Sequence, residues 1–187
     1  PDWILDTEDY SFRRGCLQRR PPIEIDIYQT NWRPWATFEN HHYLKLPLMV
    51  GATNYVALHQ GEPVAHVAVA TCTGLTTARM CRLVVMPEWQ GAGVGLRFMS
   101  WVARQWLEGR NRYGKRMTTV FHTSHPGLAA ALRRHREWLY LGGRLLGEDG
   151  YKSYATLSRS RGRPARSRYG GHMRAVQGFR YIGGAPC

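Results

Sequence analysis

The stretch from Cys81 to Glu108 constrains the fold most, because it joins a buried strand to an amphipathic helix through a glycine-rich turn. An apolar, β-branched run at residues 83–86 predicts the strand, and Pro87 ends it by removing a backbone donor. Apolar side chains then recur every three to four positions, at Val94, Phe98, Trp101, Val102 and Trp106. This spacing predicts a helix with one buried face, and therefore a strand–turn–helix unit.

The turn from Gln90 to Gly95 has the composition of an anion-binding site. Small residues let a ligand approach the backbone, and the first N–H groups of the helix lack intrahelical acceptors. The helix dipole adds partial positive charge, which suits a pyrophosphate. A tight turn without a ligand is the structural alternative. The spacing is not that of a nucleoside-triphosphate P-loop, and about 80 residues precede the turn, which disfavours a dinucleotide fold.

These residues resemble the central motif of the GNAT acyltransferases: Gln or Arg, two residues, Gly, one residue, then Gly or Ala. The resemblance implies an α/β fold with a mixed, mostly antiparallel sheet, splayed in the middle and flanked by helices. It also implies acetyl-CoA, or another acyl-CoA, as cofactor, with the pyrophosphate on the loop and the pantetheine arm on the preceding strand. The implied cofactor-binding residues are Leu83, Val84, Val85, Gln90, Gly91, Ala92, Gly93, Val94 and Gly95.

Two other stretches are candidates for the catalytic side of the site. His41, His42 and Tyr43 are adjacent, and unperturbed imidazoles titrate near neutrality. Ser124 and His125 follow another β-branched strand, at the mouth of the gap that the family opens for the pantetheine. The family resemblance implies that these five side chains converge as catalytic groups. For the histidines and Tyr43, the alternative is a hydrogen-bonded structural cluster. For Ser124, the alternative is an N-cap of the following helix.

The chain lacks the general base and the general acid at the positions where many members of the family carry them. Many carry a glutamate base in the cofactor strand, but residues 79–86 contain no carboxylate. Many also place a tyrosine acid in the helix after the second strand, and the helix expected at Leu128–Trp138 has none. The usual pair therefore cannot be transferred, and a GNAT-shaped binding module without turnover stays an open alternative.

Basic residues are concentrated in the second half of the chain. Residues 1–96 contain 8 Lys or Arg and 9 Asp or Glu, whereas residues 97–187 contain 18 and 4. Arginine suits bidentate phosphate contacts, so this asymmetry indicates an acidic partner, with nucleic acid the first candidate. A basic surface without a specific ligand is the alternative. The candidate nucleic-acid contacts are Arg161, Arg163, Arg166 and Arg168.

Three short strings, HHYL, the glycine motif and TSHPG, also resemble a narrower group of phage and bacterial GNAT proteins related to the phage Mom DNA-modification proteins. This resemblance implies a nucleic-acid acceptor, with DNA favoured over RNA. A GNAT that acts on a protein or a small amine is the alternative.

We expect an N-terminal arm at residues 1–22 and a single domain at residues 23–187. That domain would contain a basic loop at 159–174 and a late strand at about 175–183. The other expected elements are a short strand near Ile23–Ile27, a hairpin of Asn54–Leu58 and Pro63–Thr71 with His66 packed inside, a strand at Met117–Thr123 and the helix at Leu128–Trp138.

The sequence also predicts a cytoplasmic protein without a metal. No apolar run approaches the ~18 residues that a membrane-spanning helix needs, and an acidic N-terminus is not a signal peptide. The four cysteines have no CxxC spacing, which favours reduced thiols. Near the histidines, no cysteine or carboxylate has a convincing metal-ligand spacing.

Overall fold

A computed structural model describes residues 2–5, 10–15, 23–42, 49–72, 76–146 and 174–184. Its main body is a seven-stranded sheet in the order β3-β4-β5-β6-β7-β9-β8, antiparallel except between β6 and β7. The mixed, mostly antiparallel sheet predicted from the family resemblance is therefore confirmed. The strands are β3 (Asp26–Thr30), β4 (Thr53–His59), β5 (Glu62–Thr71), β6 (Thr77–Val85), β7 (Thr118–Thr123), β8 (Trp138–Leu146) and β9 (Arg174–Tyr181).

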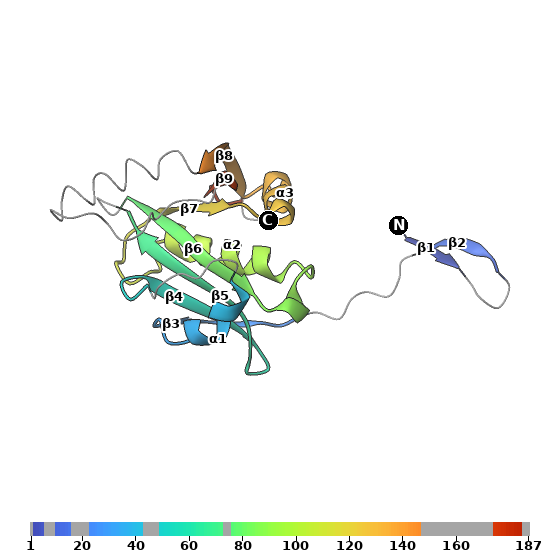
Figure 1. Ribbon diagram of the computed structural model, residues 1–187, viewed down its shortest axis with the longest axis horizontal. Helices are drawn as coiled ribbons and strands as arrows, with labels where there is room; N and C mark the ends of the chain where they lie inside the picture. Colours follow the sequence, from blue (N-terminus) through green and yellow to red (C-terminus); the bar gives the residue numbers. More distant parts are fainter. Residues whose placement is uncertain are drawn as a thin grey trace.

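Helices cover both faces of this sheet (Figure 1). On one face, α2 (Val94–Leu107) and α3 (Pro126–Arg134) bury the larger core against the strands. On the other face, α1 (Trp35–Phe38) covers a smaller cluster, and the 3-10 turn η1 (Glu39–His41) follows it. Alternation along β4 assigns the faces: Tyr55 belongs to the α2 cluster, and its neighbour Val56 belongs to the α1 cluster.

Two buried hydrogen bonds tie α2 to the sheet. The indole Nε1 of Trp106 donates to the Tyr55 hydroxyl on β4 at 3.0 Å. The Nε1 of Trp138 on β8 donates to Ser100 Oγ on α2 at 2.8 Å. Because each indole would otherwise be a buried donor without a partner, the two bonds fix the helix against both halves of the sheet.

Two predicted elements have different bounds in the structure. The helix expected at Leu128–Trp138 ends at Arg134, because His135 is extended with φ −86° and ψ 125°. Trp138 instead begins β8, a strand that the sequence reasoning missed and that pairs along its length with β9. The short strand expected near Ile23–Ile27 begins only at Asp26. The predicted hairpin is present as β4 and β5.

The first residues form a separate hairpin of β1 (Asp2–Leu5) and β2 (Phe12–Gly15) within the region expected to be an arm. Most of the basic loop, including Arg161, Arg163, Arg166 and Arg168, lies outside the described residues, as does Tyr43. Among the helices that are described, none combines the length and the apolar character needed to span a membrane.

Candidate active site

The central feature of the site is the divergence of β6 and β7. Their parallel ladder ends at the pair Met80 and Phe121, and Figure 1 shows the two strands separating beyond it. The backbone N–H of Met86 donates to the Val64 carbonyl on β5 at 2.9 Å. Backbone N–H and C=O groups alternate in direction along a strand. The backbone groups of Leu83 and Val85 therefore point away from β5 and toward the gap.

A β-bulge in β6 lies at the closed end of this gap. On β5, His66 faces Val84 and Ala68 faces Cys81, so β6 carries one extra residue between the two pairs. Arg82 lies within the bulge and has a φ of +56°, a left-handed conformation that is uncommon outside glycine. A bulge bends its strand and increases its twist, which turns β6 away from β7.

The glycine motif forms the loop at the open end of the gap. Gly91 and Gly93 have φ values of +81° and +79°, where a glycine avoids the strain of a side chain. At Gly95, an added Cβ would lie 2.8 Å from Val85 Cγ2, so this glycine lets α2 pack closely against β6. The Nε2 of Gln90 donates to the Val85 carbonyl at 2.9 Å and holds the loop on the strand.

The N-terminus of α2 fits the phosphates of an acyl-CoA. Gly93 provides no side-chain cap, and the first turn contains no acidic residue. The first α-helical bond runs from the N–H of Arg97 to the Gly93 carbonyl at 3.2 Å, which leaves the N–H groups of Val94, Gly95 and Leu96 for a ligand. Nothing lies within 4 Å of a Cβ placed on Gly93, so the approach to the loop is open.

His41 and His42 lie at the end of η1, on the α1 face. His41 is exposed, and the half-buried His42 has its ring centroid 5.5 Å from that of Trp35. Trp35 also lies 5.4 Å from the His66 ring, and the Arg82 guanidinium carbon lies 5.5 Å from the Trp35 centroid. These contacts connect His42 with the bulge of β6 through one tryptophan.

His66 is a packed histidine, as predicted. It is fully buried, stacks on Phe38 at 5.5 Å, and neither ring nitrogen has a hydrogen-bond partner among the described residues. Burial lowers its pKa to about 4, although the backbone of Arg82 partly opposes the shift without forming a well-oriented bond. The ring is therefore neutral at pH 7.

His125, and not Ser124, caps α3. The Nδ1 of His125 accepts a hydrogen bond from the backbone N–H of Leu128 at 3.1 Å, and the backbone N–H of His125 donates to Thr123 Oγ1 at 3.0 Å. The alternative of a Ser124 cap is therefore wrong. An accepting Nδ1 requires the proton to be on Nε2, which points one ring nitrogen of His125 away from the helix end. Catalytic roles for His125, Ser124 and the HHY residues stay predictions.

Sequence reasoning missed His122, which directly follows the last pair between β7 and β6. Its ring lies over Gly178 of β9, where an added Cβ would come 3.3 Å from Nε2. Its Nδ1 is buried without a partner in the described chain. Burial, and then the charges of Arg79 and Arg144, lower the pKa of this imidazole, so the ring is neutral at pH 7. Only the strand register reveals its place at the gap.

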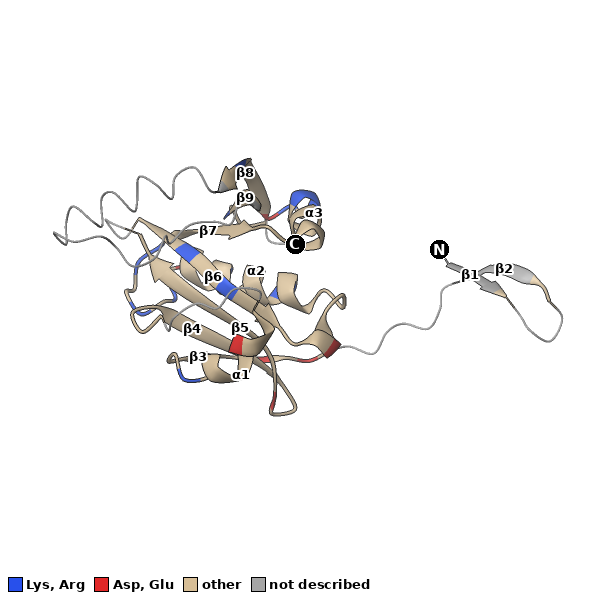
Figure 2. Cartoon of the chain, viewed as in Figure 1, with Lys and Arg blue, Asp and Glu red and all other residues tan. Residues whose placement is uncertain are grey.

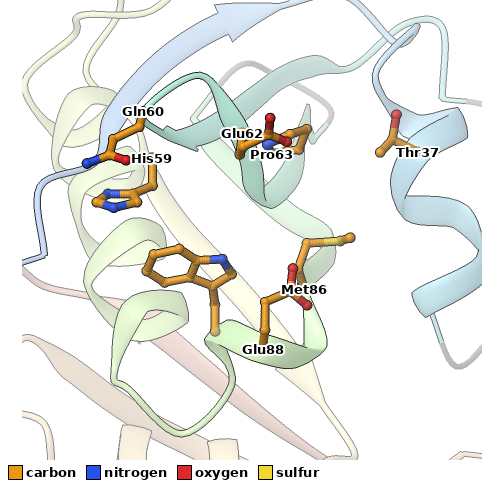
Figure 3. Close-up of a pocket in the computed structure, with 8 residues that line it drawn as sticks. Thr37, His59, Gln60, Glu62, Pro63, Met86 and Glu88 are labelled. Atoms are coloured by element: carbon orange, nitrogen blue, oxygen red, sulfur yellow. The ribbon is translucent and has the colours of Figure 1, made fainter.

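A cavity of about 600 Å³ lies at the end of β6, beside the β4–β5 turn, and not at the bulge. Figure 3 shows His59 and Gln60 of the β4–β5 turn on one side of it and Thr37 of α1 on the other. Two carboxylates, those of Glu62 and Glu88, line it without a Lys or Arg. The remaining lining residues are Pro63, Met86 and Trp89.

A sequence model of the acetyltransferase (GNAT) family matches residues 24–136, which is more than half of the chain. The chain belongs to the GNAT family. The match includes β6, the glycine loop and α2, and it confirms the acyltransferase class predicted from them. No curated protein matches the sequence at a significant level.

Solved structures agree on the fold. The ribosomal-protein-S18-alanine N-acetyltransferase of Escherichia coli has a TM-score of 0.56 at 14% identity, covering 87% of this chain and 97% of its own. A GNAT acetyltransferase of Elizabethkingia anophelis with acetyl-CoA bound has a TM-score of 0.54 at 13% identity, covering 84% and 97%. Arabidopsis thaliana Naa50, in complex with a bisubstrate analogue containing CoA, has a TM-score of 0.51 at 9% identity, covering 83% and 97%.

Proposed function

We propose that this chain transfers an acyl group from an acyl-CoA, with acetyl-CoA as the favoured donor, to a nitrogen of its acceptor. The observation that carries the proposal is the gap between β6 and β7 with the uncapped α2 N-terminus at its open end. Bound acetyl-CoA supplies the acyl group as a thioester. The free backbone N–H groups at the start of α2, those of Val94, Gly95 and Leu96, would hold the phosphates, and the backbone of Leu83 and Val85 would orient the pantetheine arm.

We assign proton removal to His122 as the first candidate. Its ring is neutral because burial disfavours the charged form, and it lies on β7 where the pairing with β6 stops. The carboxylate that many family members use is missing from β6, so a base must come from another element. His41, His42, Tyr43, Ser124 and His125 remain the candidates predicted from sequence.

We favour nucleic acid, and DNA over RNA, as the acceptor. The support is the charge of the second half of the chain and the narrower sequence resemblance to phage DNA-modification proteins. Figure 2 shows basic positions along β6, where Arg79 and Arg82 lie, and further ones at the end of α3. A base inside a duplex is hard to reach, so the acceptor would be single-stranded or flipped.

A cationic amine is the second candidate acceptor, because of the cavity that contains Glu62 and Glu88. Two carboxylates near an indole ring suit an ammonium group through charge and cation–π attraction. One similar fold is a spermidine N-acetyltransferase chimera, with a TM-score of 0.53 at 10% identity. The free thiols of Cys72 and Cys81 suit the cytoplasm as the setting for either acceptor.

Isotope-labelled acetyl-CoA distinguishes these acceptors. The purified protein is incubated with single-stranded DNA, duplex DNA, RNA, spermidine and a peptide with a free N-terminus, and each product is analysed by mass spectrometry. We expect label on the nucleic acid, with single-stranded DNA the better substrate. Label on spermidine or the peptide alone would replace the nucleic-acid acceptor with the amine, and no label on any acceptor would contradict transfer to these classes.

A further inference from the structure

Arg82 occupies a special place in the strand that borders the gap. The bulge gives it a left-handed backbone, two residues past the last pair between β6 and β7. Its guanidinium lies over the ring of Trp35, so the side chain is on the α1 face of the sheet. Bulges re-aim side chains next to functional sites, and this one directs a cation to the closed end of the gap.

In the part of the chain that the structure describes, the Arg82 guanidinium has no anionic partner. Among the described residues, no carboxylate lies within ion-pair distance of it, and its Nε is buried without a hydrogen-bond partner. The exposed Glu39 acts on it only through a longer-range attraction. Burying part of a charge without a partner is unfavourable, and the contact with Trp35 offsets only part of this penalty.

The surroundings of Arg82 increase the positive potential. Arg79 precedes it on the same strand and is exposed. His66 beside it is neutral and has no negative charge to offer. A guanidinium with free donors in a half-buried position binds a carboxylate or phosphate through two parallel hydrogen bonds, and it remains charged at any physiological pH.

We infer that Arg82 forms an anion-binding subsite at the closed end of the gap, for a carboxylate or phosphate group of a substrate. The inference rests on the proposed function and names the charge of the substrate at that site. Two sources fit the same chemistry. The anion is a carboxylate at the end of the donor's acyl group, or it is a phosphate next to the acceptor nitrogen.

Calorimetry on the full chain separates the two sources. The proteins are the wild type, Arg82→Gln, the charge-preserving Arg82→Lys, and Lys115→Gln as the control. Lys115 is an exposed cation in the turn between α2 and β7, so its loss changes the net charge equally without touching the bulge. The ligands are CoA, acetyl-CoA and succinyl-CoA, and then a single-stranded oligonucleotide added to the CoA-saturated protein.

We expect CoA itself to bind all four proteins equally. If the donor carries the anion, succinyl-CoA binds the wild type about tenfold more tightly than acetyl-CoA, and Arg82→Gln removes the difference. If the acceptor carries it, Arg82→Gln weakens oligonucleotide binding about tenfold beyond Lys115→Gln. Arg82→Lys retains part of either effect, because it keeps the charge and loses the bidentate geometry.

The subsite is overturned if the wild type binds CoA but Arg82→Gln matches Lys115→Gln with both kinds of ligand. A wild type that does not bind CoA overturns the proposed function, and this subsite with it. Circular dichroism of each variant checks that the fold is unchanged.

Discussion

At the scale of the residue, His66 couples the stability of the fold to pH. Its folded-state pKa of about 4 lies below the unfolded value of 6.5, so the unfolded chain binds more protons between these values. Its contribution is therefore complete above pH 6.5 and is lost as the pH falls toward 4. A shift of this size corresponds to about 3 kcal/mol. Urea denaturation at a series of pH values measures it.

The control for this prediction is His66→Phe, which keeps an aromatic ring against Trp35 and Phe38 and removes the titration. The informative quantity is the slope of stability against pH, because the substitution also changes the packing. The pKa of His122 is lowered in both proteins, so its contribution cancels when the two slopes are compared. Equal slopes for the two proteins between pH 6.5 and 4 would show that His66 is not the titrating group.

His122 gives a second prediction at this scale, in the pH dependence of acyl transfer. A base works only when neutral, and burial lowers the pKa of this imidazole, so kcat/KM should stay level to a pH below the ordinary range of histidine. We expect His122→Gln to lose about 10²- to 10⁴-fold in kcat and the acidic limb of the profile. An unchanged limb in this variant would move the base to another residue, with His41 next.

At the scale of the element, the packing of α2 on β6 depends on Gly95. A Cβ at this position would meet the stiff, β-branched Val85 at 2.8 Å. We expect Gly95→Ala to destabilise the protein by about 1–3 kcal/mol, although alanine is the better helix former by about 1 kcal/mol. Chemical denaturation measures the change.

The matched partner is Val85→Ala, which removes the Cγ2 atom that the new Cβ would meet. In a double-mutant cycle, the pair should be less destabilised than the sum of the single variants, because the clash exists only when both side chains are present. A Gly95→Ala protein as stable as the wild type would show that α2 does not need a glycine at this contact.

The elements also show what the sequence can predict. The strand, glycine turn and α2 follow from a local pattern, and the β4–β5 hairpin follows from alternation around a turn. β8 and the bulge at Arg82 do not, because both depend on pairing between distant strands. For the same reason, the sequence pointed to Ser124 and His125 but missed His122, whose position at the gap is set by the register with β6.

At the scale of the whole molecule, the excess of basic residues predicts salt-dependent binding to DNA. Each neutralised phosphate releases condensed counterions, so about six contacts should weaken binding roughly a thousandfold between 50 and 200 mM salt. Neutralising four arginines together should flatten this slope and leave the CoA affinity unchanged. They are Arg161, Arg163, Arg166 and Arg168.

The control neutralises the same number of arginines near the N-terminus, at Arg13, Arg14, Arg19 and Arg20. Its slope should stay close to that of the wild type. Fluorescence anisotropy with labelled DNA and RNA gives the affinities. No salt-dependent binding to either nucleic acid would leave the amine as the acceptor, and equal slopes for the two variants would assign the contacts to other basic residues.

The most direct test of the account is the affinity of the chain for CoA, measured by calorimetry on the wild type, Gly93→Asp and Gly114→Asp. Both glycines have a positive φ and nothing within 4 Å of an added Cβ, so the two variants add the same bulk, strain and charge. Only Gly93 lies at the N-terminus of α2. We predict that the wild type and Gly114→Asp bind CoA equally and that Gly93→Asp loses binding. A folded Gly93→Asp protein with wild-type affinity would contradict the assignment of this loop as the cofactor site.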